Sequence, residues 1–407
     1  MSLCFFLAAR PRPRAAPPFP VPAVKPEARL SRLRAAWARV DLERLRENYR
    51  AVAGFSSVPL IPVVKADAYG HGAVAMARAF EALAPPMLAV AYPEEGAALR
   101  AAGVRLPIVL LSPFGRGQGP MVVEQNLTPV ITTPGNLEEI LAVARTAGRR
   151  LPVHVKIDTG MNRLGFDGPG FVAAARRLAD SGRIEVEGAM THLASADEDR
   201  RATTAQLDRF DAALEALAAA GIRPPWVHAV NSAGLLELRP THTVARCGLL
   251  LFGLRPRPIA PELPVRPVMT VSASLARVVE VPAGTPVSYG GRWVARRDSR
   301  IGTLPIGYAD GVPRTEAMRE RGYLAVRGRP APVTGSVCMD LTMVDLTDHP
   351  EVGDSEEAVL FGDSPTAWDV AEWAGTTAWQ VLTAVGARVP RVYVEDGRVV
   401  EVDSPYL

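Results

Sequence analysis

The stretch 60-LIPVVKADAYGHGAVAMARAFEAL-83 contains one complete strand-and-helix unit of the predicted fold. A short apolar run ends at Lys65, and a glycine-containing turn separates this lysine from an alanine-rich stretch of helical period. Further helices are predicted over 136–147, 171–180 and 205–220. Seven more apolar runs alternate with such stretches, at 87–92, 108–113, 128–132, 152–158, 186–192, 226–232 and 243–253. Eight units over roughly 230 residues predict an eight-stranded β/α barrel.

The character of the chain changes after Pro267, where Val- and Thr-rich strands are broken by Gly and Pro. Few stretches there have a helical pattern apart from about residues 366–375. We therefore expect a barrel domain over 36–267 and a mainly β domain over 268–407.

Residues 1–35 are expected to form a disordered, basic, proline-rich extension, because their composition cannot build a core. The first 40 residues hold eight basic residues and one acid, so the rest of the chain has no basic excess that would indicate nucleic-acid binding. The sequence contains no uninterrupted run of about 18 apolar residues, so we expect no membrane span. The apolar opening 4–9 is short for an export signal. Three sparse cysteines lack metal-ligand spacing, and we expect a cytoplasmic protein without a metal.

Polar side chains recur where the predicted strands end. A single residue in such a place is more often a cap or a loop anchor, but here five strand ends share the feature. Because the active sites of barrels lie at the carboxyl ends of the strands, one shared pocket would explain these residues together. A lysine projecting into this pocket would be partly desolvated, which lowers its pKa and favours Schiff-base chemistry with a carbonyl cofactor. The residues are Lys65, Lys156 with Asp158, His192, His228 with Asn231 and Ser232, and Arg246.

The string 62-PVVKADAYGHG resembles the cofactor-lysine motif of the alanine racemase family. The resemblance extends from about Ala36 to Tyr393 and implies a β/α barrel followed by a β domain, the cofactor pyridoxal phosphate, and a head-to-tail homodimer with active sites at the subunit interface. It also implies interconversion of L- and D-alanine, which supplies D-alanine for peptidoglycan. The motifs that carry it are 156-KIDTGMNRLG, 190-MTHLASADE, 228-HAVNSAG, 286-PVSYGGRW, 305-PIGYADGVPR, 335-GSVCMDLTMVDLT and 388-RVPRVY.

The resemblance assigns cofactor-binding roles to individual residues. Lys65 would hold the cofactor, and Arg163 would contact both its phenolic oxygen and the substrate carboxylate. Lys156 matches a position that is often carbamylated, where the resulting anion orients this arginine. Arg246 would face the pyridine nitrogen; a cation there disfavours protonation of the ring and weakens the cofactor as an electron sink. The phosphate would lie among Tyr69, Asn231, Ser232 and the backbone of Gly248 and Leu249.

Racemisation needs two acid–base groups on opposite faces of a planar carbon. By resemblance, Lys65 supplies one and Tyr289, contributed by the partner subunit, supplies the other. Tyr308 and Met339 would line the narrow substrate pocket of the neighbouring subunit. His192 resembles a histidine that contacts the cofactor ring and His228 one that tunes Arg246, although a structural role for either is equally expected from the sequence.

Two departures from the family pattern leave the substrate range open. Trp379 stands where the family usually has a tyrosine that donates to the phosphate, and a phenol and an indole donate in different directions. Cys247 and Phe252 replace a common proline and tyrosine. A broader-specificity amino-acid racemase of the same fold is therefore the nearest alternative.

Other classes of protein fit less well. Lys156, His192 and His228 also suit the ligand set of a metal-dependent amidohydrolase barrel, but the first strand lacks the expected HxH pair and the last carries Arg246 instead of a metal aspartate. A non-catalytic barrel that carries the cofactor would usually lack the second domain. A decarboxylase-like relative would place a reactive cysteine in the second domain, whereas the GSVCMD setting of Cys338 resembles a racemase.

Overall fold

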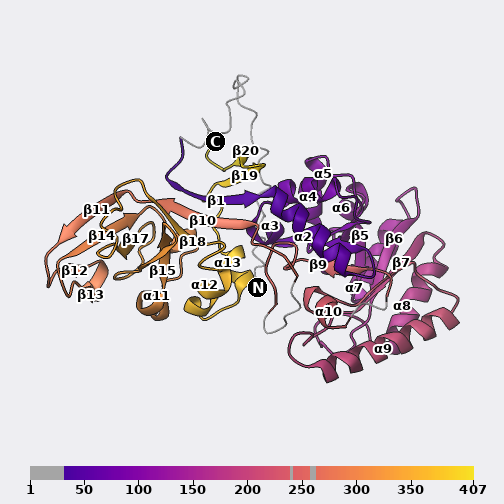
Figure 1. Ribbon diagram of the computed structural model, residues 1–407. Coiled ribbons are helices and arrows are strands. Elements are labelled where there is room, and N and C mark those ends of the chain that lie inside the picture. Colours follow the sequence, from indigo (N-terminus) through magenta and orange to yellow (C-terminus); the bar gives the residue numbers. More distant parts are fainter. Residues whose placement is uncertain (1–31, 239–241, 257–262) are drawn as a thin grey trace, which may run out of the picture.

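The computed structural model describes residues 32–238, 242–256 and 263–407. Almost all of the extension expected over 1–35 lies outside these residues. The described chain forms two regions side by side, a helix-covered barrel and a region made mainly of strands (Figure 1).

All eight predicted barrel strands form. Six of them pair in parallel in the order β3-β4-β5-β6-β7-β8, and β2 pairs with β9. The amide of Val64 donates to the carbonyl of Ala89 and that of Thr243 to the carbonyl of Val227, which joins the two sheets into a barrel-like ring. The strands are β2 (Leu60–Pro62), β3 (Leu88–Val90), β4 (Ile108–Leu110), β5 (Thr128–Ile131), β6 (Leu151–Lys156), β7 (Ile184–Met190), β8 (Trp226–His228) and β9 (Ala245–Cys247).

Successive side chains of these strands enter different clusters. Leu60 packs into the main core, whereas Ile61 belongs to a second cluster with Met87, Val109 and Val130. This alternation follows from the two-residue period of a strand. Strands buried on both faces explain why the sequence shows continuous apolar runs rather than alternation.

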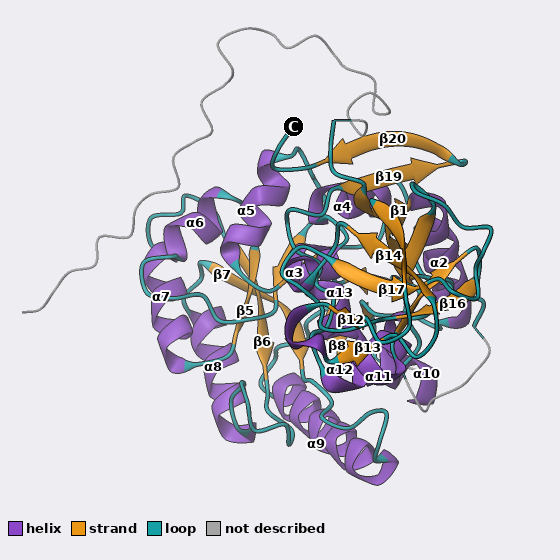
Figure 2. Ribbon diagram, turned by 90° about the vertical axis from the view of Figure 1, so that its left-hand side faces the viewer, coloured by secondary structure: helices purple, strands orange, loops and turns teal. Residues whose placement is uncertain are grey.

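Helices cover the outside of the barrel, and Figure 2 shows α5 to α8 in a row along one side. Short polar side chains start several of them: Thr133, Asp167 and Asp199 each accept from a backbone amide three residues later. The helices of this region are α2 (Leu42–Phe55), α3 (Lys65–Gly70), α4 (Ala73–Glu81), α5 (Pro93–Ala101), α6 (Gly119–Glu124), α7 (Pro134–Ala144), α8 (Gly168–Asp180), α9 (Arg200–Ala219) and α10 (Ser232–Leu238).

The second region is built on a seven-stranded sheet in the order β16-β15-β18-β10-β1-β19-β20. Its strands are β1 (Ala36–Asp41), β10 (Met269–Ser274), β15 (Tyr323–Val326), β16 (Arg329–Pro332), β18 (Glu357–Phe361), β19 (Arg391–Glu395) and β20 (Arg398–Asp403). A three-stranded sheet contains β11 (Arg277–Val281), β14 (Ser299–Leu304) and β17 (Thr342–Asp345). The hairpin of β12 (Pro286–Val287) and β13 (Trp293–Val294) completes the strands.

Short helices connect these strands. The predicted helix over 366–375 is present as α12 (Ala367–Ala374), and Gly375 ends it in a left-handed conformation. Two further α-helices and two 3₁₀ turns were not expected from the sequence: α11 (Glu316–Arg321), α13 (Ala378–Thr383), η1 (Tyr289–Gly291) and η2 (Tyr308–Asp310).

The strand β1 joins the two regions. Although the sequence places it inside the range 36–267 expected for the barrel, it pairs antiparallel with β10 and parallel with β19 of the seven-stranded sheet. The described chain thus runs from the β region through α2 into the barrel and returns to the β region after β9. By strand pairing the β region includes 36–41.

Candidate active site

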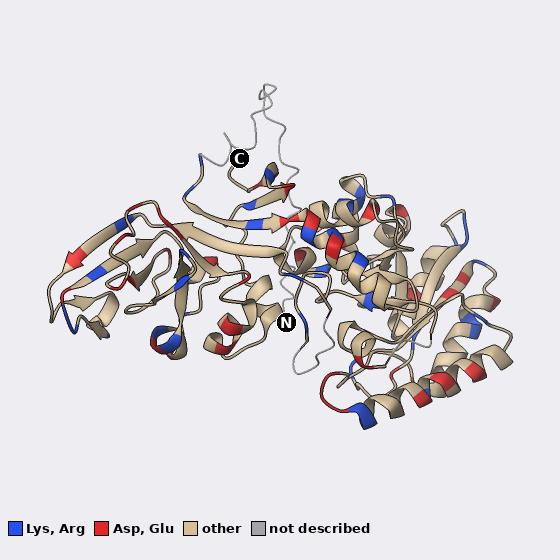
Figure 3. Ribbon diagram, in the orientation of Figure 1, with Lys and Arg blue, Asp and Glu red and all other residues tan. Residues whose placement is uncertain are grey.

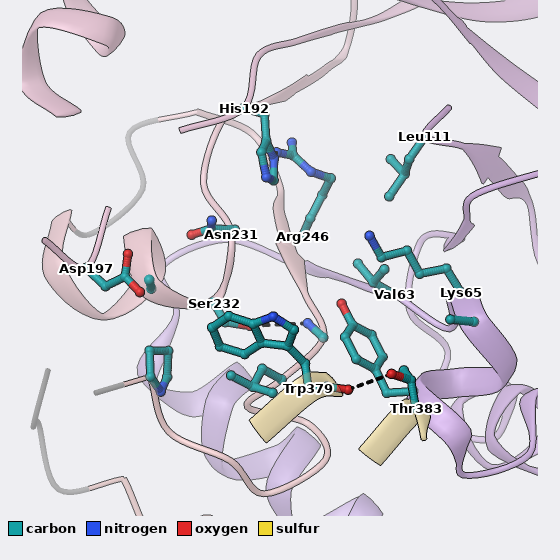
Figure 4. A pocket seen from close by; sticks show the side chains of 16 residues that line it. Val63, Lys65, Leu111, His192, Asp197, Asn231, Ser232, Arg246, Trp379 and Thr383 are labelled. Atoms are coloured by element: carbon teal, nitrogen blue, oxygen red, sulfur yellow. Dashed lines mark hydrogen bonds between the residues drawn. The ribbon is translucent and has the colours of Figure 1, made fainter. Parts of the chain in front are cut away.

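A cavity of about 400 Å³ opens at the carboxyl ends of the barrel strands (Figure 4). It brings together nine of the residues that the sequence singled out, from four barrel strand ends and from α13. They are Lys65, Tyr69, His192, Asn231, Ser232, Arg246, Gly248, Leu249 and Trp379.

Lys65 comes three residues after the end of β2 and is the first residue of α3. Burial lowers the pKa of its ammonium group, and the charges of Arg163 and Arg246 lower it further, while Glu95 opposes them. A larger fraction of the amine is therefore unprotonated at neutral pH than in a solvated lysine. This is the state in which an amine attacks a carbonyl or accepts a proton.

Arg246 on β9 is buried and surrounded by acceptors. Its Nη1 donates to His228 Nδ1 at 2.8 Å, and its Nη2 lies 3.0 Å from His192 Nδ1. The carbonyls of Thr191, His228 and Ala229 accept from the same guanidinium. Burial lowers the pKa of Arg246 to about 9, so it is still a cation at neutral pH.

The hydrogen-bond directions around Arg246 are fixed because an arginine can only donate. The Nδ1 atom of His228 must accept, so its hydrogen lies on Nε2, which is 2.8 Å from His154 Nδ1. The hydrogen of His154 then lies on Nε2, 3.5 Å from Glu187 Oε1, without the alignment of a hydrogen bond. Burial, then the charge of Arg246, keeps the pKa of His228 well below its usual value. A hydrogen-bonded relay thus runs from Arg246 through His228 to His154.

The hydroxyl groups of Ser232 and Tyr69 lie at the end of the cavity away from His192 (Figure 4). The Ser232 hydroxyl accepts from the amide of Gly248 at 3.2 Å. A Cβ atom on Gly248 would lie 2.7 Å from the Tyr69 oxygen, so the glycine permits this phenol to approach. Burial raises the pKa of Tyr69 to about 12, which keeps its hydroxyl protonated as a donor. Hydroxyl and amide donors of this kind suit a phosphate group.

Lys156 and Arg163 do not line the cavity but lie close to it. Lys156 ends β6 and is buried; burial, followed by the charges of Arg246 and Arg163, lowers its pKa to about 8. Asp158 accepts from four consecutive backbone amides, of which the last is that of Arg163. The carboxylate thereby fixes the loop that carries this exposed arginine.

Trp379 lies on α13 of the β region and forms a wall of the cavity (Figure 4). Its indole is 40% exposed and meets Trp368 edge-on at a centroid distance of 5.7 Å. Thr383, one turn later on the same helix, donates its hydroxyl to the Trp379 carbonyl at 2.9 Å. The β region therefore contributes directly to the barrel's cavity.

Three of the expected site residues lie elsewhere. Tyr289 and Met339 line a separate hollow of about 610 Å³ near the hairpin β12–β13, at the end of the β region away from the barrel (Figure 1). They are 68% and 52% exposed. Tyr308 lies beneath the guanidinium of Arg314, which is 5.5 Å from the ring centroid. Within one chain the structure does not bring Tyr289 to Lys65.

The sequence did not single out several cavity residues. Asp197 lies inside the quoted motif 190-MTHLASADE, so its carboxylate could have been considered there. Thr383 could have been found from its four-residue spacing to Trp379 on a helix. The apolar members carry no signal that distinguishes them from core. The additional lining residues are Val63, Ala66, Leu111, Asp197, Ala233, Pro256 and Thr383.

Acidic and basic residues are intermixed along the ribbon of both regions (Figure 3). In the described part of the chain, no helix combines the length and hydropathy needed to cross a membrane.

The fold and cavity define a class of protein: a two-domain β/α-barrel enzyme with a desolvated lysine and a buried arginine in one pocket. Comparison with known proteins specifies the family. Residues 40–256 match the model of the alanine racemase N-terminal domain, and residues 268–393 match that of the C-terminal domain. The chain therefore belongs to the alanine racemase family and is an isomerase.

Individual relatives agree over nearly the full length. The alanine racemase of Desulfovibrio desulfuricans is 40% identical over 369 residues, covering 89% of this chain and 99% of the relative. The structure of alanine racemase from Clostridium difficile 630 superposes with a TM-score of 0.87 at 31% identity, covering 92% and 99% of the two chains. That from Streptomyces coelicolor A3(2) has a TM-score of 0.83 at 38% identity, covering 89% and 98%.

The amidohydrolase alternative is not supported. His192 and His228 both turn Nδ1 towards Arg246, and the remaining nitrogen of His228 is bonded to His154. A metal ion there would have to compete with a guanidinium for its ligands.

Proposed function

We propose that this alanine racemase family member uses pyridoxal phosphate and interconverts L- and D-alanine by two-base proton transfer, supplying D-alanine for peptidoglycan in the cytoplasm. The observation that carries the proposal is the single cavity that holds Lys65 with reduced pKa, hydroxyl donors at Tyr69 and Ser232, and the cation of Arg246.

The donor set of the cavity fits the parts of this cofactor. Tyr69, Ser232 and the amides near Gly248 would hold the phosphate, and Lys65 would bind the aldehyde carbon. When bound, pyridoxal phosphate withdraws electrons from the α-carbon of an attached amino acid, which makes its Cα–H bond acidic. Asn231 and Leu249 also line the cavity and would complete the wall beside the phosphate.

Arg246 would face the ring nitrogen. Its charge opposes protonation of this nitrogen, and the neutral His228 and His192 hold the guanidinium in place by accepting from it. A weaker electron sink favours prompt return of the proton to carbon over side reactions. The residue therefore contributes to reaction specificity.

Two bases on opposite faces are required, and Lys65 supplies only one of them. Tyr289 is exposed and lies in a different part of the same chain. We infer a homodimer in which the partner subunit's Tyr289 reaches the cavity. In this arrangement Tyr308 and Met339 of each chain would narrow the pocket of the other and select a small side chain.

The carbamate expected at Lys156 has a physical basis. With its pKa lowered to about 8, a substantial fraction of the amine is neutral at physiological pH and available to react with carbon dioxide. The product would be an anion between two cations, Arg246 and Arg163, where the unmodified ammonium would repel both. It would turn Arg163 towards the substrate carboxylate.

Lys65→Ala tests the proposal. The purified protein should have a visible absorbance band from bound cofactor, and the variant should lose this band together with formation of D-alanine from L-alanine, measured by chiral chromatography. Screening each L-amino acid in the same assay separates alanine preference from a broader specificity. An unchanged absorbance band in Lys65→Ala would overturn the assignment of the lysine.

A further inference from the structure

The residues after Lys65 form an unusual turn. Ala66, Asp67, Ala68 and Tyr69 all have φ between 51° and 54°, which is one turn of left-handed helix. For residues with a Cβ atom this conformation is strained, and it is rare for four to adopt it consecutively. The turn separates Lys65 from Tyr69, so its shape sets the relative position of two groups in the cavity.

A carboxylate from another element holds the start of the turn. One oxygen of Glu95 accepts from the amide of Ala66 at 2.7 Å. Its other oxygen accepts from the amides of Ala91 at 2.7 Å and Tyr92 at 3.1 Å, at the beginning of α5. Since a carboxylate is purely an acceptor, all three amides can point at it. Glu95 thus connects the lysine-bearing turn to the next β/α unit.

A buried histidine holds the end of the turn. His71 Nδ1 lies 2.9 Å from the carbonyl of Ala68 and 3.0 Å from that of Tyr69. Both partners are acceptors, so Nδ1 must carry the hydrogen. The ring is stacked on Phe252 at a centroid distance of 4.5 Å, which fixes its plane.

The β region holds the same segment through Arg391 on β19. Its Nε donates to the carbonyl of Gly70 at 3.0 Å, and its other nitrogens donate to the carbonyls of Val385, Gly386 and Val389 at 2.7 to 2.8 Å. The guanidinium is buried. Arg391 therefore ties the turn to the segment that follows α13, the helix of Trp379.

We propose that Glu95, His71 and Arg391 are positioning residues that hold the left-handed turn Ala66–Tyr69 against its own strain and thereby fix Lys65 relative to Tyr69. None of the three lines the cavity. They act through backbone groups of the turn. The inference adds to the proposed function, which supplies the roles of Lys65 and Tyr69.

Glu95→Gln tests this proposal most directly, because the amide has the size of the carboxylate but turns a donor towards amides that also donate. We expect faster hydrogen exchange in residues 65–72 of the cofactor-free protein, measured by mass spectrometry. We also expect roughly 10-fold weaker binding of pyridoxal phosphate, the scale of one charge-assisted hydrogen bond. Glu94→Gln, on the exposed neighbouring side chain, is the matched control and should change neither quantity.

A second substitution distinguishes strain from charge. Ala66→Gly removes the Cβ penalty at φ 51° and loses one exposed methyl group at the edge of the cavity, so it should restore most of the protection and affinity lost in Glu95→Gln. If Glu95 acted only by its charge on Lys65, glycine would restore nothing. Failure of the rescue, or unchanged exchange in Glu95→Gln, would overturn the proposal.

The test remains decisive if Glu95→Gln does not fold. Ala66→Gly alone should then raise the midpoint of thermal unfolding, and a lowered midpoint would contradict strain in the turn. Hydrogen exchange of the cofactor-free protein does not depend on the identity of the cofactor lysine. Loss of the proposed function would appear only in the Lys65→Ala experiment.

Discussion

At the scale of a single residue, Trp379 in place of the usual tyrosine is expected to change how the cavity binds a phosphate. Its indole forms a cavity wall beside Ser232 (Figure 4). Trp368 contacts the same indole edge-on. An indole offers one N–H donor in a fixed direction, whereas a phenol offers an O–H that rotates. The family position usually holds a tyrosine that donates to the phosphate, so this chain is expected to hold the phosphate differently.

Trp379→Tyr should therefore bind pyridoxal phosphate more tightly. A gained charge-assisted hydrogen bond contributes about 1.5 to 3 kcal/mol, or about 10- to 100-fold in affinity. In the proposed dimer the new phenol should also restrain the partner subunit's Tyr289 and shift the substrate preference towards alanine. Titration of cofactor-free protein measures the first effect, and rates on alanine and a bulkier amino acid measure the second. Trp379→Phe, which lacks the hydroxyl, separates the new bond from the change in size. Weaker cofactor binding with unchanged substrate selectivity in Trp379→Tyr would show that the indole N–H already donates to the phosphate, and would contradict the prediction.

At the scale of elements, the hydrogen bond between His228 and His154, which supports Arg246, depends on a register shift between β6 and β7. The register of β6 and β7 shifts between Val153 and His154, and His154 then lies opposite Gly188. A Cβ atom on Gly188 would lie 2.2 Å from the His154 ring. The buried imidazole thus occupies the space of a missing side chain, and its bond to His228 depends on that space.

Gly188→Ala should displace His154 and destabilise the fold by about 1 to 3 kcal/mol, the usual cost of overpacking a core. Denaturant unfolding measures this loss. Because His228 loses its acceptor, Arg246 should also be held less well, which a titration with pyridoxal phosphate would detect as weaker binding. Gly54→Ala is the control, since nothing lies within 4 Å of a Cβ atom there. A variant as stable as the parent would contradict this account of the relay.

The sequence predicts the strands and helices that recur along the chain better than local features that occur once. The barrel strands and most of their helices follow from apolar runs separated by turn residues, and the resemblance adds the cavity residues. The left-handed turn Ala66–Tyr69 could not be predicted, because alanine intrinsically favours a right-handed helix and the groups that hold the turn come from elsewhere in the chain. His154 was missed for a similar reason: nothing local distinguishes it from a core residue of β6.

At the scale of the whole molecule, the two regions divide the expected site residues between them. The β region contributes Trp379 to its own barrel, while Tyr289 and Met339 lie exposed at the far side of that region. The pairing of β1 with β10 and β19 was also outside the reach of the sequence, since pairing partners more than 200 residues away leave no local pattern.

Mixing two inactive variants tests the shared site. Lys65→Ala and Tyr289→Phe homodimers should each lack racemisation, because every site in them lacks one base. After the subunits are exchanged, a mixed dimer contains one site with both bases and one with neither. Random exchange of equal amounts makes half of the dimers mixed, so about a quarter of the parent activity should return.

The measurement is D-alanine formation before and after reversible dissociation, with size-exclusion chromatography to follow the dimer. Each variant taken alone through the same treatment is the control. If both bases of a site came from one chain, exchange would restore no activity, and recovery without any exchange of subunits would equally exclude the inferred dimer.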